Sequence, residues 1–284
     1  PLDGQLAGEQ PAAQERCARG GGDVDRELLQ GHGRRGGHVT PRGMKEEPRT
    51  AAAPASDGWI EVIGTATPLK GEELLYTEHH WIRRVDGQPR EHQVRYLAPD
   101  GSLIATKQVS YPHSPATPAF TMRDLRHQTE EGGEYADDRY FLFKQEGPNA
   151  KRKREAIALG PDLVVDAGFD GFVRQHLEAL TQGQQVDFRL GVAGSLRSFD
   201  FRARKTGERT VDGRRAFDIR VEPDSMLRWF VDPLELVYSV EPVQLLEYRG
   251  RTNIATDDGD SRHDAIIRFG AETPSSGPEP LPSP

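Results

Sequence analysis

Three stretches of this chain alternate two kinds of side chain with a period of two. In 186–192, 199–204 and 217–222, apolar residues occupy every second position, and Asp, Arg, Glu or Gly occupies the positions between. Successive side chains of a strand point to opposite faces, so this pattern is typical of an antiparallel sheet with one face in water. Shorter runs bounded by turn residues continue from Trp59 to Phe269. With no repeated strand–helix–strand spacing, the sequence predicts a mainly β fold of about 10–13 antiparallel strands.

One segment follows a different period. In "GFDGFVRQHLEALTQGQ" (168–184), apolar side chains and one histidine recur at helical spacing, which predicts a single amphipathic helix over 168–182. Asp166 is the expected N-cap and Gly183 the expected stop. The stripe consists of Phe169, Phe172, Val173, His176, Leu177 and Leu180.

One helix cannot cover a sheet of this size. A helix of about 15 residues is about 22 Å long, whereas ten strands span about 48 Å. The remaining apolar face is covered only if the sheet curls on itself. We therefore expect a large curled sheet, an incomplete barrel with one central helix, whose interior is either filled or left as an apolar cleft.

The aromatic residues mark the folded part of the chain. All three Trp, eleven Phe and seven Tyr lie between Trp59 and Phe269. A segment without large apolar side chains buries too little surface to offset its ordering entropy. We predict a disordered arm over 1–56, a single β-rich domain over 57–271, and a disordered Pro/Ser tail over 272–284.

Charge and composition exclude some partners and leave others open. The arm holds eight basic and eight acidic residues, so the whole net charge of −8 falls on the remainder, which argues against nucleic acid. The basic run at 151–155 is interpreted as a solvated hairpin end. No apolar run is long enough for a transmembrane segment, no signal peptide is visible, and the single cysteine excludes an internal disulfide. The oligomeric state is not defined.

Histidines on one expected hairpin raise the question of a metal. "TEHHW" (77–81) and "REHQ" (90–93) flank the turn, and a turn centred on Gly87-Gln88 places His79 and His92 on one face about 13 Å apart. That separation is too large for one metal. A register centred on Asp86-Gly87 would make them diagonal neighbours. We predict no metal site and no cofactor.

No pattern of residues marks a catalytic site. His176 lies on the apolar stripe, where it is either a core residue or a general base in a cleft, and the sequence assigns it no partner. The acidic stretch 256–264 lacks the ligand spacing of a calcium loop and is interpreted as a hairpin turn. The apolar segment 224–232, which includes Trp229, is expected to form a short helix, as core or as a lid.

Three passages together resemble an uncharacterised family of proteobacterial β-rich proteins. They are "GEELLYTEHHW", "DAGFDGFVRQHLEALTQGQQVDFRL" and "VDPLELVYSVEPVQLLEYRGRTNI". The resemblance implies export to the periplasm or cell envelope; without it, the cytoplasm is the expected location. The expected architecture is also similar to that of lipoprotein carriers of the LolA/LolB type, in which a curled sheet holds acyl chains.

The leading hypothesis is an envelope protein, not an enzyme, that binds an apolar or acyl-bearing ligand or lipid in a concave sheet. Two alternatives remain: a structural or interaction module with a filled core, and a hydrolase that uses a cleft histidine. The predicted ligand-binding residues are Phe169, Phe172, Val173, His176, Leu177, Phe188, Phe199, Phe201 and Trp229.

Overall fold

The computed structural model divides the chain into two units, 1–49 and 50–284, and describes residues 57–224 and 232–280 of the second. The strands of the first half are β1 (Gly58–Pro68), β2 (Tyr76–Val85), β3 (Gln88–Leu97), β4 (Leu103–Ser110), β5 (Ala119–Asp124), β6 (Thr129–Ala136), β7 (Arg139–Glu146), β8 (Lys153–Ile157) and β9 (Leu163–Val165). The helical segments are η1 (Asp166–Gly168), α1 (Phe169–Gln175), α2 (Leu177–Thr181) and η2 (Ala193–Ser195). The remaining strands are β10 (Val186–Val192), β11 (Arg197–Val211), β12 (Arg214–Pro223), β13 (Leu234–Val240), β14 (Val243–Ala255), β15 (Arg262–Phe269) and β16 (Thr273–Ser275).

All described strands belong to one sheet. Its order is β8-β7-β6-β5-β4-β3-β2-β1-β15-β14-β13-β12-β11-β10-β9, and β16 pairs with β1 beside this path. Every pairing is antiparallel except that of β9 with β10. The expected curled, mainly antiparallel sheet is confirmed, and it does not close through hydrogen bonds. The described residues form 16 strands rather than 10–13, and the additional ones include β9 and β16, which are too short for a readable alternation.

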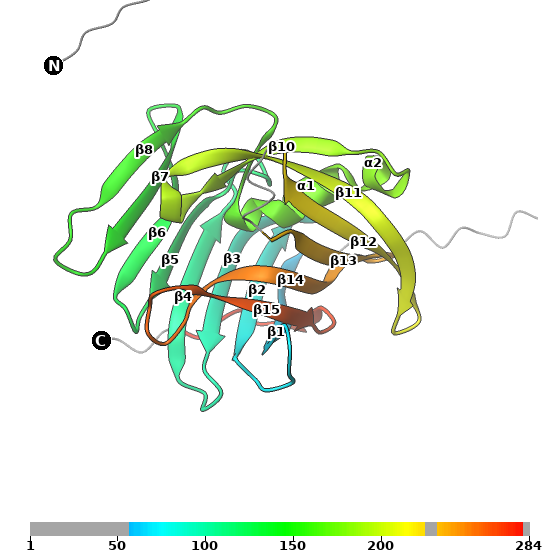
Figure 1. The fold of residues 1–284 in the computed structure, drawn as a ribbon, viewed down its shortest axis with the longest axis horizontal. Coiled ribbons are helices and arrows are strands. Elements are labelled where there is room, and N and C mark those ends of the chain that lie inside the picture. The colour runs from blue at the N-terminus through cyan, green and yellow to red at the C-terminus, as the bar shows by residue number, and fades with distance from the viewer. Residues whose placement is uncertain (1–56, 225–231, 281–284) are drawn as a thin grey trace, which may run out of the picture. The chain divides into compact units, whose positions relative to one another are not determined.

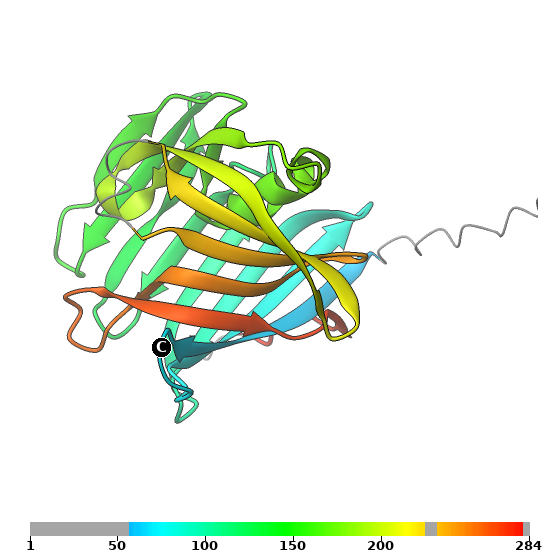
Figure 2. The same ribbon diagram turned by 45° about the vertical axis from the view of Figure 1, so that its right-hand side comes forward.

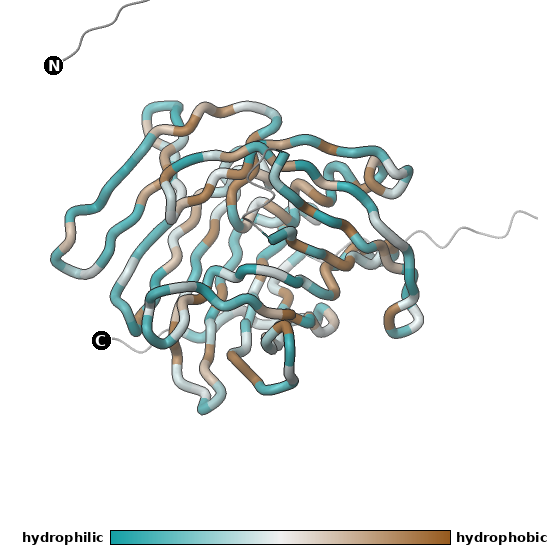
Figure 3. Tube along the Cα trace, viewed as in Figure 1, coloured by the Kyte–Doolittle hydropathy of each residue, from teal (hydrophilic) through white to brown (hydrophobic). Residues whose placement is uncertain are grey.

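The sheet curls so that its two halves face each other, with α1 on the concave side (Figures 1 and 2). The apolar side of α1 packs on β10–β13, where Phe172, Val173 and Phe188 are 3%, 0% and 3% exposed. Apolar residues, brown in Figure 3, gather around α1 and its neighbouring strands. The helix thus covers only part of the concave face, as the comparison of areas predicted.

Strand β9 is buried on both of its faces. Val164 packs in the cluster that contains α1, whereas Leu163 and Val165 pack against Tyr140 and Leu142 of β7. The end of the sheet is therefore turned inward, and its last strand lies against the strands of the opposite half. This arrangement joins two apolar clusters through one three-residue strand.

The predicted single helix is interrupted at His176, whose backbone leaves the helical region between α1 and α2. The stop at Gly183 is confirmed: with φ of +81° it ends α2, its N–H bonds to the Leu180 carbonyl, and the N–H of Gln184 bonds to Ala179. The prediction that Asp166 caps the helix is wrong. Asp166 lies in η1, and its carboxylate instead accepts a hydrogen bond from Lys107.

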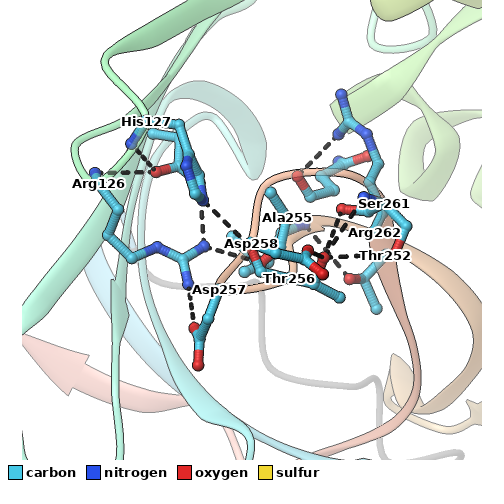
Figure 4. Close-up of polar contacts among 12 residues, drawn as sticks. Arg126, His127, Thr252, Ala255, Thr256, Asp257, Asp258, Ser261 and Arg262 are labelled. Atoms are coloured by element: carbon cyan, nitrogen blue, oxygen red, sulfur yellow. Dashed lines mark hydrogen bonds and ion pairs between the residues drawn. The ribbon is translucent and has the colours of Figure 1, made fainter.

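Side chains join two distant parts of the sheet across one end of the concave space. The Arg126 guanidinium of the β5–β6 turn contacts Asp257 and the Ala255 carbonyl of the β14–β15 hairpin, and the His127 ring contacts the Thr256 carbonyl (Figure 4). Arg262 of β15 donates twice to Glu131 of β6, at 2.8 Å each. Five strands separate β5 from β14 in the sheet, so these contacts clamp the curl without strand pairing.

Four further segments were assigned from the sequence. Residues 273–275 pair with β1, so the predicted disorder of 272–284 is wrong at its beginning, because the unpaired end of β1 offers backbone partners. In the basic run, Arg152 and Arg154 stack on Phe143 and Phe141 at the edge formed by β8. The predicted helix within 224–232 and the predicted disorder of 1–56 lie almost wholly outside the described residues.

Candidate functional site

Four of the predicted ligand-binding residues form one aromatic group between α1 and β10–β11. The ring centroids of Phe172 and Phe188 are 4.5 Å apart, and Phe169 lies 5.7 Å from each of them. Phe201 of β11 is 6.0 Å from Phe188. The period-two and helical patterns bring these residues together because both place their apolar side toward the concave face.

The other predicted residues are placed less uniformly. Val173 is buried in the same cluster, whereas Leu177 and Phe199 are half-buried and lie outside it. The ring of His176 packs on Phe172, with centroids 4.8 Å apart. Trp229 lies outside the described residues. Of the predicted residues, the structure therefore brings together the four phenylalanines, Val173 and His176.

A charged stripe runs along the neighbouring side of the helical segment. Asp166, Asp170 and Arg174 follow one another at intervals of four residues. The Arg174 guanidinium donates to Asp170 at 2.7 Å, and the Tyr238 hydroxyl of β13 donates to the same carboxylate at 3.2 Å. Lys107 of β4, whose side chain is 6% exposed, donates to Asp166 at 2.7 Å. The concave space thus presents apolar and charged surfaces side by side.

A hydrogen-bonded chain of three titratable side chains lies on the concave wall formed by β2 and β3. Nε2 of His80 is 2.8 Å from the Glu78 carboxylate, and Nδ1 of His80 is 2.9 Å from Nε2 of His92. Both ring nitrogens of His80 are therefore engaged. The sequence placed His79 on the same face as His92, and that assignment is wrong, because His79 pairs with Arg95 and its side chain lies on the opposite face.

The β2–β3 turn explains the different pairing. Asp86 and Gly87 both have positive φ, 52° and 71°, so the turn is centred on them as in the second register considered from the sequence. An irregularity between Arg83 and Arg84 then shifts the pairing by one residue. A shift of one residue exchanges the two faces of a strand, so His80 rather than His79 faces inward.

Burial governs the ionisation of this wall. Desolvation lowers the pKa of His92 well below its ordinary value, and the charges of His80 and Lys107 lower it further. Burial raises the pKa of Tyr76 and Tyr96 well above the ordinary value, and the nearby Glu78 carboxylate adds to both increases. Glu78 is thus an acidic side chain of this wall, and the tyrosines beside it are neutral.

Among the described residues, no group of three His, Cys, Asp or Glu side chains could hold a metal ion. In the Glu78–His80–His92 chain, His80 bonds to its neighbours through both nitrogens. The Lys107 ammonium also acts on His92, and a cation at that position repels a metal.

The sequence did not indicate a groove of about 410 Å³ between β3 and β7. Its lining mixes polar and apolar side chains, and cross-strand pairing places Gln93, Gln108 and Thr121 in one row across the sheet. The groove is lined by Glu91, His92, Gln93, Gln108, Val109, Ser110, Ala119, Phe120, Thr121, Gly133, Glu134 and Phe143.

The fold defines the class: a β-rich protein built on one open, curled, mainly antiparallel sheet around a short helix. No protein-family model matches the chain, and no curated protein matches it. Within the described residues, no helix is both long and apolar enough to cross a membrane.

The solved structures that match at low similarity include the following two. The first is a β-barrel-like protein of the domain of unknown function DUF1849 from Brucella abortus, with 6% identity over 76% of this chain and 96% of that one, at a TM-score of 0.38. The second is a DUF1329 family protein from Desulfovibrio piger, with 9% identity over 78% of this chain and 86% of that one, at a TM-score of 0.27. Likenesses this weak carry no argument about function, and the resemblance to LolA/LolB-type carriers stays a prediction.

Proposed function

We propose that this protein binds an apolar or acyl-bearing small molecule on the concave side of its sheet, beside α1. The observation that carries the proposal is the unequal burial of the aromatic group. Phe172 and Phe188 are each 3% exposed, whereas Phe169 and Phe201 at its margin are only half-buried. Apolar surface therefore continues from the core to an accessible edge, as in most small-molecule sites.

Further apolar side chains extend this margin. Half-buried residues from β10, β13 and β14 pack against the same buried cluster: Leu190, Leu234, Leu245 and Tyr248. An exposed apolar surface that adjoins a core is characteristic of ligand or partner contact. An acyl chain is the kind of ligand that such a strip accommodates.

The charged stripe of the helical segment supplies the complementary polar contacts. Asp170 and Arg174 lie on the helix that also carries Phe169 and Phe172. Ligand sites typically combine a mostly apolar lining with a few polar groups that orient the ligand. The proposed ligand is accordingly an amphiphile, with its chain on the aromatic group and its polar end toward this stripe.

The experiment is native mass spectrometry of the purified full chain, followed by titration with a fluorescent fatty acid. We expect a co-purifying lipid or saturable probe binding, and we expect Phe201→Ala to weaken probe binding by about tenfold. Phe141→Ala is the matched control, because Phe141 is a half-buried phenylalanine on the opposite face, beneath Arg154. Absence of both lipid and probe binding would contradict the proposal, as would an equal effect of the two variants.

The second candidate function is a structural or interaction module whose core is filled. It is favoured by the complete burial of Val173 and by the 1% exposure of Leu180, which show tight packing of α1 and α2. In that case His176→Leu leaves stability unchanged or raises it, and no probe binds. The hydrolase alternative gains no support, because the His176 ring packs on Phe172.

We also propose a cell-envelope location, which the family resemblance suggests. Fractionation of cells that express the native gene is the test. Recovery of the protein wholly in the cytoplasmic fraction would contradict this location.

A further inference from the structure

The Glu78–His80–His92 chain has a limited capacity for protons. In its neutral form, Nε2–H of His80 donates to Glu78, and Nε2–H of His92 donates to Nδ1 of His80. One added proton converts His80 to an imidazolium that donates to both neighbours, while Nε2 of His92 becomes an acceptor. A second added proton leaves two N–H groups pointing at each other across 2.9 Å, and the hydrogen bond between the rings is lost.

The surroundings of the chain oppose the second proton. The side chains of Glu78 and His80 are 8% and 16% exposed, so water stabilises added charge only weakly. Lys107 projects from β4 and is already paired with Asp166 of η1. From β15, the ring of Phe269 lies 5.7 Å from His80, and Tyr96 of β3 is neutral and buried. Glu78 is therefore the only acid hydrogen-bonded to the two imidazoles among the described residues.

We propose that the His80–His92 hydrogen bond is a pH-sensitive joint between β2 and β3, closed at neutral pH and opened by acid. When this hydrogen bond opens, β2 and β3 separate locally, and their backbone amide hydrogens exchange with solvent. The two histidines belong to different strands, so repulsion between them acts directly on the pairing of Ile82 with His92 and of His80 with Val94. The joint does not depend on whether the concave side binds a ligand.

The direction of the pH dependence follows from which state binds the second proton more tightly. The folded state binds the second proton weakly, whereas the unfolded or locally opened state accepts it at the ordinary histidine value of about 6.5. The open state therefore holds more protons below this pH, and the closed state loses stability as the pH falls through it.

The test is hydrogen exchange of the full chain, followed by mass spectrometry at about pH 7 and about pH 5, with correction for intrinsic exchange. We expect amides of β2 and β3 to exchange about tenfold faster at the lower pH, while those of β11 and β12 change little. His92→Gln removes the titrating ring but keeps an amide that can bond to His80, so acid should no longer accelerate exchange. His79→Gln is the matched control, since His79 is the next residue on the opposite face, near Glu61, and it should behave as the native chain does.

Two results would overturn the proposal: no acceleration of β2 and β3 in the native chain, or equal acceleration in His92→Gln. If His92→Gln does not fold, His80→Gln serves the same purpose. If both variants fail to fold, a nuclear magnetic resonance titration of the native histidine rings decides. Two rings that titrate independently at the ordinary histidine pKa would refute the joint, and one strongly depressed titration coupled to exchange of β2 would support it.

Discussion

The ammonium of Lys107 lies 2.7 Å from the carboxylate of Asp166 inside the curled sheet. This pair joins the wall formed by β4 to η1, the turn that leads into α1. The amide of Asn253 on β14 donates to the same carboxylate at 3.2 Å. Asp166 also has a positive φ of 29°, so the contact holds a backbone conformation that few residues adopt. The pair therefore positions the helical segment between two walls of the sheet.

Breaking this pair should be costly. Lys107→Met leaves the Asp166 carboxylate, 16% exposed, without its cation, and removal of one partner of a buried pair typically costs about 3–5 kcal/mol. Urea denaturation followed by circular dichroism measures the loss, and adding Asp166→Asn should recover most of it. Lys153→Met, at an exposed pair with Glu146, is the control and should have no measurable effect. Equal stability of the two single variants would refute the structural role of the pair.

Gly168 permits a close approach between η1 and the β4–β5 loop. A Cβ atom at this position would lie 1.9 Å from the Ala116 carbonyl oxygen, which accepts a hydrogen bond from the N–H of Val165. Gly168→Ala should therefore destabilise the fold by about 3 kcal/mol in the same assay. Gly183→Ala, where only the positive φ opposes a side chain, should cost about 1 kcal/mol. A smaller loss of stability for Gly168→Ala than for Gly183→Ala would show that the β4–β5 loop moves to make room for the added methyl group.

The clamp across the concave space should contribute more than an ordinary surface pair. Arg262→Gln removes two hydrogen bonds to Glu131, 18% exposed, and should lower stability by about 1 kcal/mol, with a smaller effect in high salt. Arg251→Gln is the control, because Arg251 also donates twice to a carboxylate, that of Asp264, but only between adjacent strands. Thermal melting of both variants at two salt concentrations measures the difference, and equal losses would contradict a role for the clamp.

Alkaline conditions should destabilise the protein once the pH rises above the point at which free tyrosine ionises. Burial holds the pKa of Tyr76, Tyr96 and Tyr238 well above the ordinary value, so the folded state retains protons that the unfolded state releases above about pH 10. This contribution to stability is fully present below that pH and is lost progressively as the pH rises above it, toward the raised pKa of the folded state. Tyrosinate absorbance and circular dichroism should change together. Absorbance that rises while the fold stays intact would show that these hydroxyls are accessible.

Much of the fold was predictable because its signal is local. Strands such as β10 and β12 alternate cleanly, and the helical stripe at 169–180 differs in period from everything around it. The break at His176 was not predictable, because its apolar spacing continues across the interruption. The role of Asp166 was also not predictable. Its partner Lys107 lies 59 residues away, and an acidic residue just before a helix looks like an N-cap in the local sequence.

The candidate site was predictable only on its apolar side. Phe172 and Phe188 meet because each belongs to a readable pattern. The inward position of His80 depends on an irregularity near Arg83, and a single residue of shift decides which of two adjacent histidines faces inward. Neither the turn residues nor the histidines themselves encode that shift. The arrangement of the polar wall could therefore not be predicted from the sequence.

The place of β1 in the sheet has a consequence for how the chain reaches this state. Strand β1 begins at Gly58 and pairs on one side with β2, its neighbour in sequence, but on the other side with β15, which begins only at Arg262. During synthesis, β1 can pair with β2 early, but its pairing with β15 must follow the emergence of nearly the entire domain from the ribosome. Contacts this distant along the chain make folding slow. The nascent protein therefore exposes an unpaired, aggregation-prone strand edge during most of its synthesis.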